Sequence, residues 1–164
     1  MLREEIEKDF KKALKEGNKE ELSALRMLKT EIVNRQKEKR YKLSKENSDF
    51  SSQELEEKSS LDDEEIKEAV FSLVKKSKQA IEDFEKGERK DLAEKEKKEV
   101  EVLKKYLPEQ LSEEEIEKEA QETIREVGAE GMKDMGRVMS ELMLKLKGKA
   151  EGSKVSRIVK DLLS

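Results

Sequence analysis

Residues 66–87 read IKEAVFSLVKKSKQAIEDFEKG, and this stretch carries the clearest structural pattern in the 164-residue chain. Its apolar side chains recur every three or four residues and stop before a glycine. That spacing places them on one face of an α-helix, and glycine commonly ends a helix. Comparable stripes recur along most of the chain, so the sequence predicts an all-α fold.

The composition supports this prediction and excludes several classes of function. Charged residues make up 48% of the chain and apolar residues 33%, with one proline and no tryptophan, which does not suit a β-sandwich or barrel. The chain has neither cysteine nor histidine, so thiol nucleophiles, disulfides and imidazole bases or metal ligands are excluded. We expect no cofactor and no metal. Without a long apolar segment or a signal peptide, we also expect a cytoplasmic protein that does not enter membranes.

Residues 1–107 are predicted to form about four helices, arranged as hairpins or as a bundle. The first should end at Gly17-Asn18, the second should run from Leu22 to about Lys39, and the third and fourth should cover 66–84 and 92–107. Residues 43–61 are rich in serine and acidic residues and predict a flexible insertion, with a short helix at 53–58 as the less favoured alternative.

Residues 109–164 are predicted to form a separate three-helix domain. Pro108 cannot continue a helix, and Ser112 with Glu115 has the spacing of a capping box that starts the next one. This helix should end at Gly128, and the following helix should begin near Gly131, carry Asp134 in its first turn and end at Gly148. Gly136 within that helix indicates a close approach by a neighbouring helix, and the last helix should follow Gly152.

Charge is distributed unevenly along the chain. Acidic residues dominate 109–130, whereas basic residues dominate 131–164 and 25–45. In the segment KLKGKAEGSK at 145–154, four lysines surround two glycines and the start of a helix, which predicts a phosphate site, although a solvated loop would have the same sequence. The predicted RNA-binding residues are Arg137, Lys145, Lys147, Lys149, Lys154 and Arg157, supported by Arg26, Lys29 and Arg35.

Other patterns are better explained by structure than by catalysis. The segment at 147–153 has the wrong order of glycine and lysine for a nucleotide-binding P-loop. The acidic runs at 62–65 and 113–115 are typical of the first turn of a helix. The methionines at 135, 139 and 143 share one helix face and are predicted to pack in the core.

Several motifs, in this order, resemble the YqeY family. They are LRMLK at 25–29, RKDLAEKE at 89–96, YLPEQL at 106–111, DMGRVM at 134–139 and KGKAEGS at 147–153. The C-terminal part of that family is similar to the tail domain of the B subunit of tRNA-dependent amidotransferase, so the resemblance implies contact with tRNA. The family is labelled a carbon-nitrogen ligase with glutamine as amido-N-donor, a label that we interpret as inherited from the shared tail. The insertion at 44–60 departs from the family's shorter connector.

Three functions follow as hypotheses. The first is an accessory module that binds the phosphate backbone of tRNA or another structured RNA. The second is participation in glutamine-dependent amidation as a subunit or partner of an amidotransferase, because the chain lacks the residues to catalyse this reaction alone. The third is a helical adaptor that binds another protein.

Overall fold

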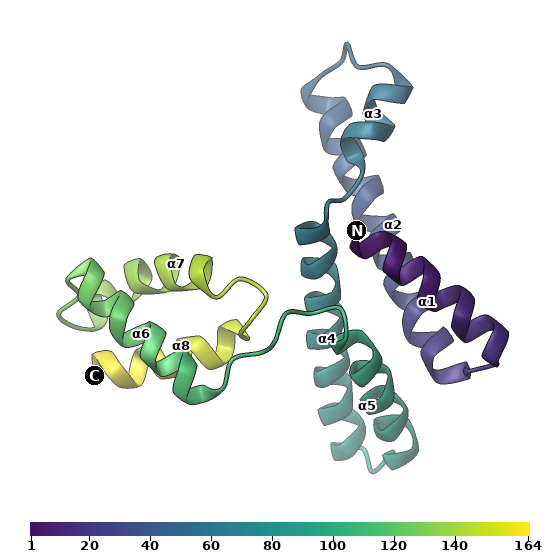
Figure 1. The fold of residues 1–164 in the computed structure, drawn as a ribbon. Coiled ribbons are helices and arrows are strands. Elements are labelled where there is room, and N and C mark those ends of the chain that lie inside the picture. The colour runs from purple at the N-terminus through teal and green to yellow at the C-terminus, as the bar shows by residue number, and fades with distance from the viewer. The chain divides into compact units, whose positions relative to one another are not determined.

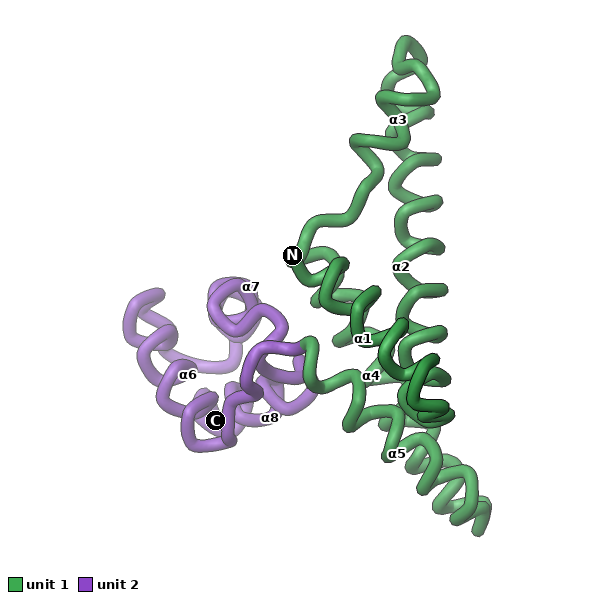
Figure 2. Tube along the Cα trace, turned by 45° about the vertical axis from the view of Figure 1, so that its right-hand side comes forward, with its two compact units in different colours: residues 1–106 green, residues 107–164 purple.

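The computed structural model describes residues 1–164 and contains only helices (Figure 1). The prediction of an all-α fold is confirmed. The chain divides into two compact units, residues 1–106 and residues 107–164, shown in green and purple in Figure 2. None of the helices combines the length and the apolar composition needed to cross a membrane.

Unit 1 is built around its longest helix, which contacts each of the others in the unit. Small sets of leucine, isoleucine and valine side chains from all but the shortest helix form its buried core. The helices are α1 (Leu2–Glu16), α2 (Lys19–Glu46), α3 (Ser52–Ser59), α4 (Asp63–Lys86) and α5 (Lys90–Lys104).

The turn between α1 and α2 follows the predicted pattern. Gly17 adopts a left-handed conformation with φ of 67°, and its N–H donates to the carbonyl of Ala13. The side chain of Asn18 then accepts a hydrogen bond from the N–H of Glu21 and caps α2. The stop at Gly17-Asn18 is therefore confirmed.

The predicted flexible insertion at 43–61 contains a helix, which agrees with the less favoured alternative of a short helix at 53–58, whereas the predicted end of the second helix is wrong. α2 continues to Glu46 and does not end near Lys39. Ser51 and Glu54 then form a capping box that starts α3. α3 packs beside the end of α2, where Arg40 donates to the hydroxyl of Ser52 at 2.9 Å. These contacts with α3 stabilise the extra turns of α2.

Lys39 of α2 binds both the residue that follows α3 and the first turn of α4. Its ammonium donates to both carboxylate oxygens of Glu65 at 2.8 Å and to the carbonyl of Ser60 at 3.2 Å. Asp62 and Glu65 also form the capping box of α4, so the acidic run at 62–65 starts a helix as predicted.

Tyr106 closes the core of unit 1 just after α5. Its side chain is 3% exposed, and its hydroxyl donates to Oδ2 of Asp9 at 2.7 Å. Burial, the hydrogen bond to Asp9 and the negative charge nearby all raise the pKa of Tyr106 well above its usual value. The tyrosine is therefore held in its neutral form, with its ring among apolar side chains.

Unit 2 is a three-helix domain with a core of its own. It contains α6 (Glu113–Val127), a short 3₁₀ turn η1 (Met132–Asp134), α7 (Met135–Lys145) and α8 (Gly152–Leu163). The three methionines of α7 pack against this core, as predicted. The fully buried apolar residues are Ile116, Ala120, Val138, Leu142, Val155 and Val159.

Two predictions for α7 are wrong. A Cβ atom at Gly136 would meet nothing within 4 Å, so this glycine does not allow a close helix approach. α7 also ends at Lys145 rather than at Gly148, because the chain turns at residues 146–149. Asp134 lies at the N-cap of α7 and Gly128 closes α6 with φ of 62°, both near their predicted places.

We expect Ser51→Ala to destabilise α3 by about 1 kcal/mol, because it removes half of the capping box. Hydrogen exchange of the backbone amides of α3 should become faster, while exchange in α5 should not change. Ser48→Ala is the control, since this residue precedes the helix and its hydroxyl contacts only Asp49. Equal exchange in α3 for the Ser51 variant and the wild type would contradict this role.

We expect Tyr106→Phe to lower the free energy of unfolding of unit 1 by about 1 kcal/mol, because the hydrogen bond to Asp9 is lost. The raised pKa also predicts a pH dependence: the stabilisation is complete below about pH 10, the unfolded pKa of tyrosine, and is lost as the pH rises above it. The variant should therefore lose less stability above pH 10 than the wild type in chemical denaturation. Tyr41→Phe is the matched control, since this ring is 60% exposed. The same alkaline decline in all three proteins would refute the role of Tyr106.

Candidate nucleic-acid interface

The junction between α7 and α8 is held by a turn that only glycine adopts easily. Gly148 has φ of 73°, and a Cβ atom there would lie 3.7 Å from the ring of Pro108. α8 starts four residues later at Gly152, where a Cβ atom would meet the methyl group of Met143 at 3.7 Å. Gly148 is therefore required by its left-handed backbone, whereas a Cβ atom at Gly152 would make only an ordinary packing contact.

The segment that begins unit 2 is hydrogen-bonded to this junction. Nε2 of Gln110 donates to the carbonyl of Gly148 at 2.8 Å and to that of Pro108 at 2.9 Å. The backbone N–H of Leu111 donates to the carbonyl of Lys149 at 2.9 Å. The motifs at 106–111 and 147–153 are far apart in the sequence, but these hydrogen bonds connect them directly. Sequence reasoning missed the role of Gln110, because no local pattern pairs it with Gly148.

A carboxylate of the chain itself lies at the start of α8. Glu151 is the N-cap residue, and the hydroxyl of Ser153 donates to its Oε1 at 3.0 Å. A negative side chain at this position interacts favourably with the helix dipole. The predicted phosphate site at Gly152 and Ser153 would therefore have to compete with Glu151.

Lys154 and Arg157 converge on one acidic oxygen. Nζ of Lys154 lies 3.3 Å from Oε1 of Glu113, and Nη2 of Arg157 lies 3.1 Å from the same atom. Both cations project from α8, whereas Glu113 is the first residue of α6. We refer to these three residues as the Glu113 cluster. All three side chains are more than 40% exposed, so the cluster is accessible from solvent.

Arg137 and Lys145 lie elsewhere, so the predicted RNA-binding residues of unit 2 do not form a single group. Arg137 donates to the carbonyl of Val127, and Lys145 pairs with Glu126, which raises the pKa of Lys145. Glu126 and Glu113 are thirteen residues apart on α6, about 20 Å along the helix axis. Arg137 and Lys145 therefore lie outside the Glu113 cluster, and their role in RNA binding stays a prediction.

Lys147 and Lys149 flank Gly148, and both are exposed. The carbonyl of Lys149 is bonded to Leu111, two residues before Glu113, so its backbone lies near the Glu113 cluster. The ammonium of Lys149 makes no ion pair. Lys149 therefore adds an accessible positive charge close to the start of α6.

The cations predicted in unit 1 are mostly engaged within the unit. Lys29 pairs with Glu7 at 2.7 Å and lies over the ring of Phe10 at 4.4 Å. Arg35 pairs with Glu31 on the same helix at 3.0 Å, whereas Arg26 is exposed. These three residues do not form a cluster of free positive charge.

The acidic run at 113–115 has the structural role that was predicted. Ser112 and Glu115 form a capping box, and the predicted start of α6 is correct. The backbone N–H and the hydroxyl of Ser112 both donate to the Glu115 carboxylate and lower its pKa. No group of three or more carboxylates is placed to hold a metal ion.

Comparison with known proteins identifies the family. Residues 35–163 match the family described as Yqey-like protein. The chain belongs to the YqeY-like family. The resemblance inferred from the motifs is therefore confirmed, and the match continues through the insertion.

Two relatives show how far the similarity extends. The chain is 27% identical over 161 residues to altered inheritance of mitochondria protein 41, mitochondrial, of Pyrenophora tritici-repentis, covering 96% of this chain and 78% of the relative. It is 56% identical over 39 residues to uncharacterized protein C22F3.15 of Schizosaccharomyces pombe, covering 24% of this chain and 32% of the relative. The first name places that relative in mitochondria, and the cytoplasmic location expected for this chain remains a prediction.

Substitution of two glycines by alanine should have opposite effects. Gly136→Ala should raise the free energy of unfolding of unit 2 by about 1 kcal/mol, because it improves helix propensity at an open position. Gly148→Ala should lower it by about 1 kcal/mol or more, because alanine is strained at φ of 73°. Thermal unfolding of both variants would test this. Equal shifts of the melting temperature in the two variants would contradict the difference between the two positions.

Proposed function

We propose that this YqeY-like protein is an accessory module that binds the phosphate backbone of a structured RNA through the Glu113 cluster. The observation that carries the proposal is the convergence of Lys154 and Arg157 on a single oxygen of Glu113. Two cations aimed at one acidic oxygen are also arranged to bind a phosphate oxygen. Transfer RNA is the partner suggested by the resemblance to the amidotransferase tail domain.

Glu113 occupies the position that a phosphate oxygen would take, and it can be displaced at small cost. Its side chain is 56% exposed, and exposed ion pairs contribute only about 0–1 kcal/mol. Each backbone phosphate carries one negative charge, as the carboxylate does, and its oxygens can accept hydrogen bonds from both cations at once. The exposed Lys149 nearby would add to the attraction.

A part in glutamine-dependent amidation would require another protein. The chain has no cysteine or histidine to act as nucleophile or base. RNA binding by this chain would place a bound tRNA within reach of a partner that performs the chemistry. The proposed role is thus compatible with the carbon-nitrogen ligase label without assigning catalysis to this chain.

The test is the salt dependence of tRNA binding by the full chain, measured by fluorescence anisotropy between about 50 and 200 mM salt. In Lys154→Gln/Arg157→Gln, the slope of log affinity against log salt should be smaller in magnitude by about two, or about one per phosphate contact. Glu113→Gln should instead bind more tightly than the wild type, because it removes the competing carboxylate.

Arg137→Gln/Lys145→Gln is the matched control. It removes the same number of charges from unit 2 but lies outside the Glu113 cluster, so its slope should equal that of the wild type. Circular dichroism would verify that each variant is folded. The proposal is wrong if both double variants behave alike, or if Glu113→Gln does not tighten binding.

A further inference from the structure

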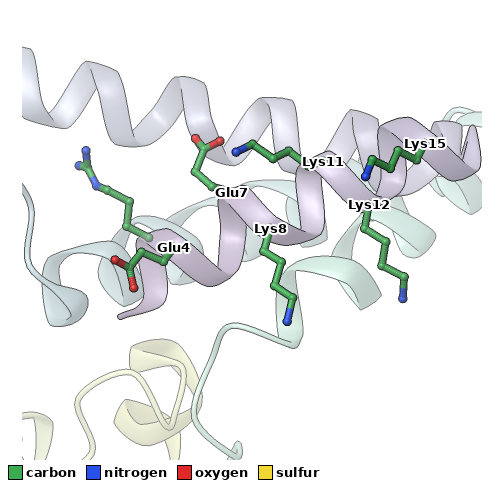
Figure 3. A pocket seen from close by; sticks show the side chains of 7 residues that line it. Glu4, Glu7, Lys8, Lys11, Lys12 and Lys15 are labelled. Atoms are coloured by element: carbon green, nitrogen blue, oxygen red, sulfur yellow. The ribbon is translucent and has the colours of Figure 1, made fainter.

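α1 carries a face of four lysines that the sequence analysis did not single out. Lys8, Lys11, Lys12 and Lys15 recur at the spacing that places them on one side of the helix (Figure 3). The opposite side packs into unit 1 through Ile6 and Ala13, which are 1% and 0% exposed. We refer to the four lysines as the α1 lysine face.

The positive charge of this face is not neutralised within the protein. All four lysines are exposed, and none of their ammonium groups forms an ion pair or a hydrogen bond. Many other lysines are paired: for example, Lys97 contacts Glu85 and Glu94, and Lys98 contacts Glu20. Four ammonium groups without an ion pair thus lie within about 10 Å along one helix.

The neighbouring acidic residues are already engaged by other cations. Glu7 pairs with Lys29 of α2 at 2.7 Å, and Glu4 lies 3.7 Å from the amino terminus. Both border the same shallow depression of about 730 Å³ that the four lysines line. Because the charges of Glu4 and Glu7 are balanced elsewhere, the α1 lysine face keeps a net positive charge.

The surroundings favour a nucleic-acid backbone over a lipid surface. A helix that lies on a bilayer inserts an apolar face, but the apolar face of α1 is buried within unit 1 through Ile6 and Ala13. Phosphate groups require only accessible positive charge.

We propose that the α1 lysine face is a second RNA-backbone surface, located in unit 1 and separate from the Glu113 cluster. The inference rests on the proposed function in that both surfaces would bind the same class of partner. The family resemblance implies RNA contact through the C-terminal part alone. This inference adds a contact through unit 1.

The experiment compares two variants of the full chain that each replace four lysines by glutamine. The first changes the α1 lysine face, at positions 8, 11, 12 and 15. The second changes Lys67, Lys76, Lys97 and Lys104, which are already ion-paired, and so produces the same net charge. Anisotropy with labelled tRNA should show the salt slope of the first variant reduced by three to four, at about one per contact, while the second variant should keep a slope close to that of the wild type.

Equal slopes for these two variants would overturn the proposal, because net charge rather than the α1 lysine face would then govern binding. Binding to phosphatidylserine vesicles that is lost in the first variant, with unchanged tRNA binding, would also overturn it in favour of a lipid surface. The result is independent of the Glu113 cluster. If Lys154→Gln/Arg157→Gln leaves the slope unchanged while the α1 variant reduces it, the proposed site in unit 2 fails and this one stands.

Discussion

The hydrogen bonds of the segment Tyr106–Leu111 are the interactions on which both units depend. Tyr106 completes the core of unit 1 through Asp9, whereas Gln110 and Leu111 bind the carbonyls of Gly148 and Lys149 in unit 2. With 48% of its residues charged, the chain has few apolar side chains for either core. A small number of polar contacts therefore marks where each core ends.

The all-α fold and several helix ends could be predicted from the sequence because their signals are local. Asn18, Ser112 and Gly128 each act within a few residues of their own position, so the spacing of the sequence contains the whole interaction. The same kind of signal was present at Ser51 and Glu54 but was outweighed by the serine-rich composition around it. Composition describes an average environment, whereas a capping box is a specific pair of hydrogen bonds.

The candidate site could be predicted only in part, because its geometry depends on contacts between distant residues. Lys154 and Arg157 were identified from charge, but nothing in the sequence pairs them with Glu113, more than forty residues away. Arg137 and Lys145 belong to the same excess of basic residues, but they contact the other end of α6. Gly136 was expected to allow a close helix approach, but the structure leaves open space beside it, and only Gly148 has a left-handed backbone.

In a molecule with this many charges, a basic residue is informative only if its charge is not cancelled nearby. An exposed ion pair attracts a distant polyanion weakly, because the fields of its two opposite charges nearly cancel at distances larger than their separation. A free cation acts at full strength, and several on one helix face add their potentials. The excess of basic residues at 131–164 therefore overstates the attraction of unit 2, where Glu126 offsets the charge of Lys145 and Glu113 offsets one of the two charges of Lys154 and Arg157. α1 carries several acidic residues along its length, yet its exposed lysine face lacks such partners. Judged by unpaired positive charge, the α1 lysine face therefore ranks above unit 2. The sequence alone gives the opposite order, because ion pairs between distant residues are visible only in the structure.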